Sequence, residues 1–393
     1  MNARIVSLCL VAATTAGTRA CGADHSPPEA ARLDSTVVQV PMDLATGRPI
    51  VALAVNGRGS YRFIVDTGAG GSVIDACLAR ELELPVVGRD SLGDPTNPAA
   101  IQADRVRTDS VVLGGVKLGG VTMAAFDIRK MMGPSYGGVL GLPDLAEFLV
   151  TLDYPHGQIR LTRGELTPGD TTAVDYQSPD GIISLPIQVN GIPFSAHLDS
   201  GNPGAFMLPR TRASGLAFKS PPTEIGQAGT VSNISSIWLA QLDGEIRVAG
   251  VSYRDPEVHL SDLLDRWANI GFDALRELSV TIDQRNHRLR LERTGTPEGG
   301  ARPARRRLGI MFAGMQAGTG GLPITEGGIK IDRVAPGSLA EKAGLKPGDL
   351  IRTINDHPAK DLALGELTEL FGGSQPLRFR VLREGREVDI AIE

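Results

Sequence analysis

Two short runs that begin with aspartate mark matching positions in this chain. Residues 66–69 read DTGA and residues 199–202 read DSGN, so the second Asp follows the first after 133 positions (199 − 66). Each run comes directly after a short strand-like stretch, at 63–65 and 196–198. A single Asp-Thr/Ser-Gly triplet arises often by chance, so its meaning depends on the surrounding sequence.

The surrounding sequence is duplicated as well. Each run is preceded by an Asn-Gly pair, which is typical of a tight hairpin turn, and is followed by an apolar-apolar-Gly segment and a strand-like segment. In the two halves these segments are 56–57 and 190–191, 139–142 and 269–272, and 150–153 and 280–283. Both downstream pairs are offset by 130 positions (271 − 141 and 283 − 153). The constant order predicts an internal repeat in which each Asp ends the second strand of a hairpin.

Composition and charge narrow the class of protein. The 393 residues are 41% hydrophobic and include 48 Gly and 26 Pro, which indicates a globular, turn-rich chain with room for two or three domains. The formal net charge is −5, and residues 305–307 form the only dense basic run. Because no basic stripe is interleaved with aromatic residues, nucleic acid is not expected as a partner.

The N-terminus reads as a secretory signal peptide over residues 1–20, with Arg4 before an apolar run and Cys21 after it. Cys21 is also a possible site for a lipid anchor, although Thr18 and Arg19 stand where a lipoprotein signal has other residues. The predicted location is therefore secreted or periplasmic, or tethered to the cell envelope. Cys77 is predicted to be a small buried apolar residue, and no disulfide framework is implied.

The chain divides into three predicted domains. The first repeat occupies residues 34–163 and the second 180–293, and strand signals dominate both. Residues 294–307, which are rich in Pro and Gly, predict a flexible linker before a third domain at 308–393. The repeats contain few helical signals, and these lie at 74–82, 143–148 and 262–269.

The repeat resembles the aspartic-protease superfamily of retroviral-type and pepsin-like enzymes over most of residues 34–293. The pattern behind the resemblance is a hydrophobic-hydrophobic-Asp-Thr/Ser-Gly turn followed later by an apolar-apolar-Gly strand, and this chain has both elements twice. The resemblance implies a mainly β, two-lobed, acid-protease-like β-barrel fold in which each lobe contributes one catalytic carboxylate. By resemblance, Asp66 and Asp199 form the dyad, and the residues that support it are Thr67, Gly68, Ser200 and Gly201.

Elementary chemistry explains why such a site uses two carboxylates. Two carboxyl groups held close together cannot both ionise cheaply, so one keeps a proton and the other stays charged. The charged group can take a proton from a water molecule that attacks a peptide carbonyl, while the protonated group donates to the carbonyl oxygen. This reaction needs neither a cofactor nor a metal, and the scattered His and Cys residues predict no metal site.

Three features of the repeat differ from the family pattern or need a separate interpretation. Asn202 follows the second triplet where the family usually has Ala, Ser or Thr, and no Tyr occurs between Leu84 and Leu118, where a pepsin-like flap would carry one. A retroviral-type flap lacks that Tyr, and residues 226–229 are the flap candidate of the second lobe. His197 lies two residues before Asp199, where it either biases the protonation of the dyad or is a partly buried structural residue.

The C-terminal residues 308–393 resemble PDZ domains of the kind associated with bacterial proteases. The resemblance rests on VAPGSLA at 334–340, AGL at 343–345, PGDLI at 347–351 and IN at 354–355. It implies an α+β domain that binds a peptide C-terminus as an added strand beside a helix, predicted at 362–371. Leu364, Leu367 and Leu370 line that helix at helical spacing and serve either the groove or the core. The residues implied as the carboxylate-binding loop are Leu308, Gly309, Ile310 and Met311. Arg305–Arg307 either attract the carboxylate or form a solvated charge run.

Three functions fit the sequence. The first is an aspartic endopeptidase whose PDZ domain binds a peptide or protein substrate. The second is a catalytically inactive peptide-binding adaptor of the cell envelope, which Asn202 and the absence of a flap Tyr favour. The third is a structural envelope protein that uses the PDZ domain alone for assembly. The duplicated dyad motif favours the endopeptidase.

Overall fold

The computed structural model describes residues 4–5, 37–94, 97–229, 234–264, 267–294, 306–313, 324–325 and 327–393. Arg4–Ile5 form strand β1, whereas the rest of the predicted signal peptide and Cys21 lie outside the described residues, as does most of the predicted linker. The described chain is mainly β, which confirms the predicted fold class. No helix within the described ranges is long and apolar enough to cross a membrane.

The first repeat forms one large sheet around the first Asp. From edge to edge its strands are β1, β6 (Val86–Asp94), β7 (Asn97–Arg107), β10 (Thr122–Phe126), β5 (Val73–Asp75), β11 (Tyr136–Gly141), β4 (Arg58–Asp66), β3 (Ile50–Val55), β8 (Val111–Leu113) and β9 (Val116–Leu118). Strands β3 and β4 form the predicted hairpin around the Asn-Gly pair, and β11 runs parallel to β4 with Gly141 opposite Asp66.

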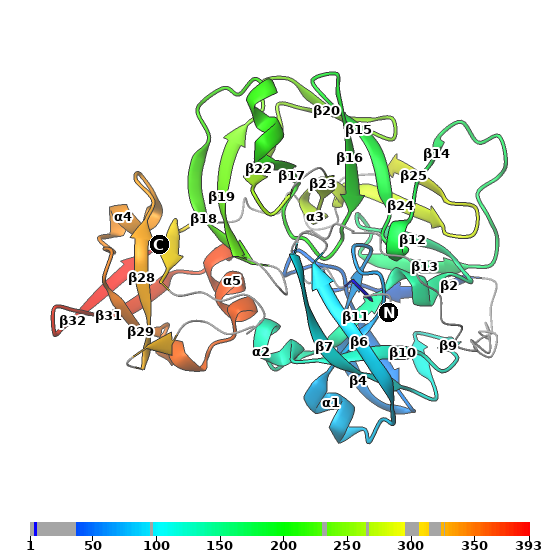
Figure 1. The fold of residues 1–393 in the computed structure, drawn as a ribbon, viewed down its shortest axis with the longest axis horizontal. Helices are drawn as coiled ribbons and strands as arrows, with labels where there is room; N and C mark the ends of the chain where they lie inside the picture. Colours follow the sequence, from blue (N-terminus) through cyan, green and yellow to red (C-terminus); the bar gives the residue numbers. More distant parts are fainter. Residues whose placement is uncertain are drawn as a thin grey trace.

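The second repeat builds a sheet with the same strand order, except that β1 has no counterpart in it. Its strands are β18 (Thr223–Gly229), β19 (Ile234–Gln241), β22 (Glu257–Ser261), β17 (Phe206–Pro209), β23 (Trp267–Ile270), β16 (Ile192–Leu198), β15 (Ser184–Val189), β20 (Glu245–Val248) and β21 (Val251–Arg254). Strand β23 runs parallel to β16 as β11 runs parallel to β4. Each half of the repeat is thus a copy of one fold, and Figure 1 shows the two lobes one above the other.

A third sheet joins the two lobes. It has the order β14 (Ala173–Asp175), β25 (Arg288–Arg293), β24 (Leu278–Asp283), β12 (Leu149–Asp153), β13 (Gln158–Thr162) and β2 (Val37–Pro41). Strands β12 and β24 occupy equivalent positions of the repeat, and they pair antiparallel with Thr151 opposite Thr281. The two Thr Oγ1 atoms lie 3.1 Å apart, which marks the pseudo-twofold centre of this sheet.

Two sequence predictions about local structure are wrong. The predicted helix at 262–269 does not form, because residues from Trp267 onward belong to strand β23, which fills the place between β16 and β17. Cys77 is exposed and not buried. It lies on helix α1 (Ala76–Glu81), whose N-terminus is capped by Asp75 and whose Leu78 and Ala79 face the core.

The other expected helices are present with shifted bounds. Helix α1 begins two residues after the predicted start at 74, because Val73–Asp75 form strand β5. The segment predicted at 143–148 is a short 3-10 helix, η1 (Leu142–Leu145).

The C-terminal domain has its own apolar core. Its main strand order is β26 (Ile310–Phe312), β28 (Gly328–Val334), β29 (Leu350–Ile354), β31 (Leu377–Arg383) and β32 (Arg386–Ile392), with β27 (Ile324–Thr325) beside β28 and β30 (His357–Pro358) beside β29. Its helices are α4 (Leu339–Ala343) and α5 (Leu364–Gly372), close to the predicted 362–371. Leu367 is a core residue, with Leu364 and Leu370 packed against the same core.

The C-terminal domain packs against both lobes (Figure 1). Helix α2 (Ile128–Met132) of the first lobe packs against α5, and the Tyr136 hydroxyl donates to Glu369 Oε1 at 2.6 Å. On the second lobe, Arg333 forms a two-pronged ion pair with Glu224 of β18, at 2.8 and 3.0 Å. Arg307 likewise pairs with Glu257 of β22.

The contact between α2 and α5 depends on Gly365. A Cβ atom at this position would lie 2.6 Å from Met132 Cα, closer than side chains approach backbone. We expect Gly365→Leu to separate the C-terminal domain from the first lobe, since Leu favours the helix but cannot fit against Met132. Small-angle scattering should then give a larger radius of gyration with unchanged circular dichroism. Gly115→Leu, at a position with open space around it, is the matched control, and equal radii for both variants would contradict the prediction.

Candidate active site

The two hairpins deliver Asp66 and Asp199 to equivalent places at the lobe interface. Asp66 is the last residue of β4, and Asp199 follows β16 directly. The parallel neighbour strand fixes each position, because Gly141 pairs with Asp66 and the Asp199 N–H donates to the Ile270 carbonyl at 2.9 Å. Both Asp residues are 1% exposed. The structure therefore brings together the two carboxylates that the sequence placed 133 residues apart.

Gly68 and Gly201 allow each triplet to lie against the carboxyl group of the opposite lobe. A Cβ atom on Gly68 would lie 2.7 Å from Asp199 Cγ, and one on Gly201 would lie 2.6 Å from Asp66 Oδ2. Any larger residue at either position would displace a carboxyl group. The Gly68 N–H also donates to Asp66 Oδ1 at 2.8 Å. The two glycines thus set the close approach of the two carboxylates.

Thr67 and Ser200 join the lobes through crossed hydrogen bonds. The Thr67 hydroxyl donates to the Leu198 carbonyl at 2.7 Å, and the Ser200 hydroxyl donates to the Val65 carbonyl at 2.7 Å. Each hydroxyl also accepts the backbone N–H of the other residue at 3.0 Å. All four predicted supporting residues therefore lie at the interface beside the carboxylates, where they hold the two triplets in register.

The two carboxylates have different surroundings. Burial, the charge of Asp199 and a hydrogen bond with Asp199 raise the pKa of Asp66 well above its usual range. Asp199 accepts two further hydrogen bonds, from the Asn202 N–H at 3.0 Å and from Asn269 Nδ2 at 2.8 Å. Asp66 accepts the backbone N–H groups of Gly68 and Gly201, so the side-chain amide of Asn269 on Asp199 is the difference between the two carboxyl groups that these contacts show.

Sequence reasoning missed two residues that contact the second triplet. Asn269 lies at the position equivalent to Val139, 130 residues earlier, so aligning the two halves was enough to single it out. Arg48 is 3% exposed, and its Nε donates to the Gly201 carbonyl at 3.0 Å. Nothing in the repeat pattern marks Arg48, because it stands in the turn before β3 and contacts the opposite lobe.

His197 and the flap candidates have clear places in the fold. His197 is 1% exposed and its ring stacks on Trp267, with 4.9 Å between ring centroids. Each lobe carries a long hairpin at the same end of its sheet, β6–β7 in the first lobe and β18–β19 in the second. Gly226 lies in β18 at an irregularity of the β18–β19 ladder, so the flap candidate of the second lobe falls on this hairpin.

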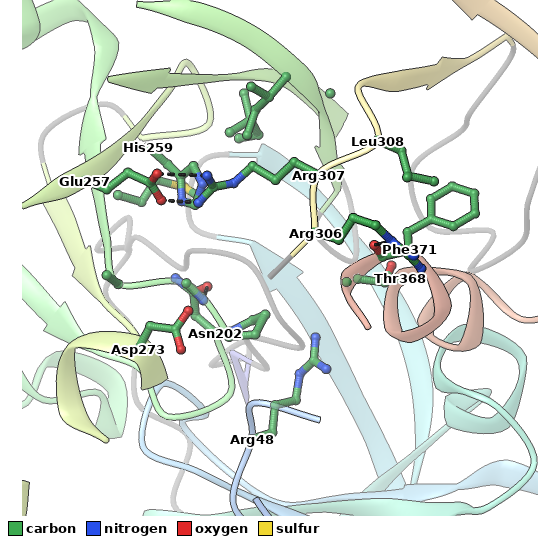
Figure 2. A pocket seen from close by; sticks show the side chains of 18 of the residues that line it. Arg48, Asn202, Glu257, His259, Asp273, Arg306, Arg307, Leu308, Thr368 and Phe371 are labelled. Atoms are coloured by element: carbon green, nitrogen blue, oxygen red, sulfur yellow. Dashed lines mark hydrogen bonds and ion pairs between the residues drawn. The ribbon is translucent and has the colours of Figure 1, made fainter. Parts of the chain in front are cut away.

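A cavity of about 600 Å³ lies where the two lobes meet the C-terminal domain (Figure 2). One wall contains Asn202, which hydrogen-bonds to Asp199, together with Ile225 and Gly226 of β18. The opposite wall contains residues of the predicted carboxylate-binding loop and apolar residues of α5. These are Leu308, Gly309, Ile310, Leu364, Leu367 and Phe371. One cavity thus extends from the loop and helix of the C-terminal domain to a direct neighbour of the dyad.

The loop at 308–311 leads into β26, the outer strand of its sheet, and the Ile310 carbonyl lies near Gly226 of β18, where a Cβ would be 3.8 Å from the oxygen. The Gly309 carbonyl accepts the Ala335 N–H at 2.8 Å, so the pair Ile310–Val334 is a non-hydrogen-bonded pair of the β26–β28 ladder. The N–H and C=O of Ile310 therefore point away from β28. Gly309 has a φ of 76°, and a Cβ there would lie 2.5 Å from Ser338 Cβ. Met311 is buried, and the backbone groups of Ile310 lie on the side of β26 away from β28.

The basic run before this loop has a structural role where it is described. Arg306 donates to the Leu370 carbonyl at 3.0 Å and to the Gln375 carbonyl at 2.6 Å, at the C-terminal end of α5. Arg307 pairs with Glu257, as Figure 2 shows. Arg305 lies outside the described residues. The interpretation as a solvated charge run is wrong for Arg306 and Arg307, because both contact the protein.

Two protein-family models match parts of this sequence, and both matches agree with the architecture described above. Residues 51–143 match the family model described as aspartyl protease, and residues 301–378 match the PDZ domain model. The chain therefore carries an aspartyl-protease domain and a PDZ domain. The first match includes Asp66 and lies within the first lobe, so the likeness of the second lobe rests on its repeated strand order. No curated protein matches the chain.

Proposed function

We propose that this protein is an aspartic endopeptidase in which Asp66 and Asp199 activate a water molecule. The observation that carries the proposal is the pair of buried carboxylates, each at the end of an equivalent hairpin and each against the glycine of the opposite triplet. The aspartyl-protease match over the first lobe supports it. No group of His, Cys, Asp or Glu among the described residues is arranged to hold a metal ion.

The proposed mechanism uses the asymmetry of the dyad. Ionised Asp199 takes a proton from the water as the water oxygen attacks the peptide carbonyl carbon. Protonated Asp66 donates its proton to the carbonyl oxygen, which gives a neutral tetrahedral diol. The diol then collapses: its nitrogen takes the proton from Asp199, one diol hydroxyl gives its proton to Asp66, and the C–N bond breaks. A carboxylic acid and an amine leave, and the dyad is back in its starting protonation state. The crossed hydrogen bonds of Thr67 and Ser200 keep both carboxyl groups in place during these transfers.

We further propose that the PDZ domain binds the peptide or protein substrate. The support is that β26, the outer strand of its sheet, and helix α5 line the cavity that reaches Asn202. A substrate bound on this edge is then close to the dyad, which raises its effective concentration there. A secretory leader would place this activity outside the cytoplasm, free or tethered to the envelope.

Inhibitor classes test the proposed reaction. We expect a denatured protein substrate to yield new termini by mass spectrometry at mildly acidic pH. These products should persist in the presence of a metal chelator and after alkylation of Cys77, the exposed thiol. The proposed reaction of the dyad uses neither a metal ion nor a thiol. Loss of the products with chelator or alkylation would contradict an Asp-only mechanism.

A further inference from the structure

The second lobe differs from the first at two positions beside its Asp. Where the first lobe has Ala69 and Val139, the second has Asn202 and Asn269: Ala69 and Asn202 directly follow the triplets, and Val139 and Asn269 each lie two residues before the Gly of the parallel strand. Both Asn residues are buried, at 6% and 1% exposure. A buried amide costs free energy unless its hydrogen bonds are made, so a paired substitution beside one carboxylate calls for a physical reason.

The two amides form a chain of hydrogen bonds that ends on Asp199. The Gly204 N–H donates to Asn202 Oδ1 at 2.9 Å, and Asn202 Nδ2 then donates to Asn269 Oδ1. This leaves Asn269 Nδ2 to donate to Asp199 Oδ2 at 2.8 Å. Because a backbone N–H can only donate, it fixes the orientation of both side-chain amides. Asn269 therefore presents a donor, never an acceptor, to the carboxyl group of Asp199.

We propose that Asn202 and Asn269 are positioning residues that assign the single proton of the dyad to Asp66 and keep Asp199 ionised as the base. The inference rests on the proposed function for its catalytic meaning. A symmetric dyad leaves both protonated forms equal in energy, whereas a side-chain donor on one carboxyl favours its ionised form. Backbone donors do not distinguish the two carboxyl groups, because Asp199 accepts the Asn202 N–H while Asp66 accepts those of Gly68 and Gly201. The equivalent positions of the first lobe, Ala69 and Val139, carry no side-chain donor.

Other titratable or charged groups surround the dyad, and the test has to leave them unchanged. Tyr154, after β12, feels the charges of both carboxyl groups, and burial raises its pKa; Arg48 donates to the Gly201 carbonyl. Farther out, His197 on β16 stacks on Trp267, and His259 on β22, whose pKa desolvation lowers to about 4, lies near Arg307 and Glu257. Asn269→Val removes only the amide and introduces the residue of the equivalent position. Val139→Ala is the matched control, because it changes packing on the equivalent strand without removing a donor.

The pH dependence of kcat/KM is expected to report the change. In Asn269→Val the acidic limb should move up by about one pH unit, with about a tenfold loss of kcat/KM below it and little change in KM. Asn202→Ala should shift the limb in the same direction by less, since the Asn269 amide then loses its orienting partner. The Val139→Ala profile should keep the wild-type limb. The proposal would be overturned if the acidic limb of kcat/KM stayed at the wild-type pH in both Asn269→Val and Asn202→Ala.

A second measurement does not depend on activity. Carbon chemical shifts of the Asp66 and Asp199 carboxyl groups in the full chain should show Asp199 ionising first in wild-type protein. In Asn269→Val the two titrations should draw together. If wild-type protein cleaves nothing yet shows this difference, the inference holds while the proposed function fails. Identical titrations in folded wild-type and variant proteins would overturn the inference, and Asn202→Ala serves if Asn269→Val does not fold.

Discussion

Asp66→Asn and Asp199→Asn are each expected to lower kcat/KM for peptide hydrolysis by about 10⁴-fold or more. Each change removes one of the two proton-transfer groups, and the remaining carboxyl group cannot act as acid and base at once. The double variant should be no slower than either single variant, because the two groups act as one unit. Initial rates on one defined peptide, measured with all three variants, check this. Single variants that retain a tenth of the wild-type rate would contradict the dyad.

The same two variants should differ in their free energy of unfolding. This measurement shows whether a loss of activity comes from the missing carboxyl group or from unfolding. In the folded protein the pKa of Asp66 is raised by burial and by Asp199, whereas in the unfolded chain it is about 3.9. The folded state therefore binds more protons above about pH 4, and stability falls as pH rises through the raised pKa. In Asp66→Asn the side chain at this position is neutral at every pH, so this fall in the free energy of unfolding does not occur.

Between about pH 4 and the raised pKa of Asp66, we therefore expect the stability of Asp66→Asn relative to wild type to increase by about 1.4 kcal/mol per pH unit. Asp199→Asn should lose about 1–3 kcal/mol, because the donors from Asn202 and Asn269 then meet an amide that accepts at one oxygen only. Urea unfolding at pH 4 and pH 7 measures both effects. A gain for Asp199→Asn with a loss for Asp66→Asn would reverse the assignment of the proton.

Gly201→Ala is expected to abolish activity by displacing a carboxyl group. Its Cβ would lie 2.6 Å from Asp66 Oδ2, and neither Asp66 nor the buried triplet can move without breaking the crossed hydrogen bonds. We expect a loss of about 10³-fold in kcat/KM and of about 2–4 kcal/mol in the free energy of unfolding. Gly68→Ala should behave alike, since its Cβ would lie 2.7 Å from Asp199 Cγ.

Gly115→Ala is the control for these glycine variants, because a Cβ there meets nothing within 4 Å. It should keep wild-type activity and stability. Wild-type rates for Gly201→Ala would show that the carboxylates do not need the close approach seen in the structure.

The placement of Asp66 beside Asp199 could be predicted because the features that produce it are local and occur twice. The Asn-Gly turns, the Asp-Thr/Ser-Gly runs and the apolar-apolar-Gly strands each have a short-range signature, and their order gave the equivalent hairpins. The close approach of Gly68 and Gly201 to the opposite carboxylates follows from the same duplication. The C-terminal domain was recognisable for the same reason, since its motifs are short and continuous.

Features that depend on contacts between distant segments were not predictable. The segment at 262–269 has helical composition, but β23 must fill a gap between two strands, so tertiary context overrides propensity. Arg306 and Arg307 looked like a solvated run because their partners, at the end of α5 and on β22, are far away in sequence. Asn269 was visible only by comparing its position with Val139. The packing of the PDZ domain on both lobes left no signature in the sequence.

Cleavage of a mixed peptide library across pH 3 to pH 8 tests the central claim most directly. The protein used would be residues 22–393, with the Asp66→Asn/Asp199→Asn double variant as background. We predict cleavage by wild-type protein with a bell-shaped dependence on pH, since Asp199 must be ionised and Asp66 protonated, and none by the double variant. Folded wild-type protein that cleaves no peptide at any pH would contradict the account and favour a peptide-binding adaptor.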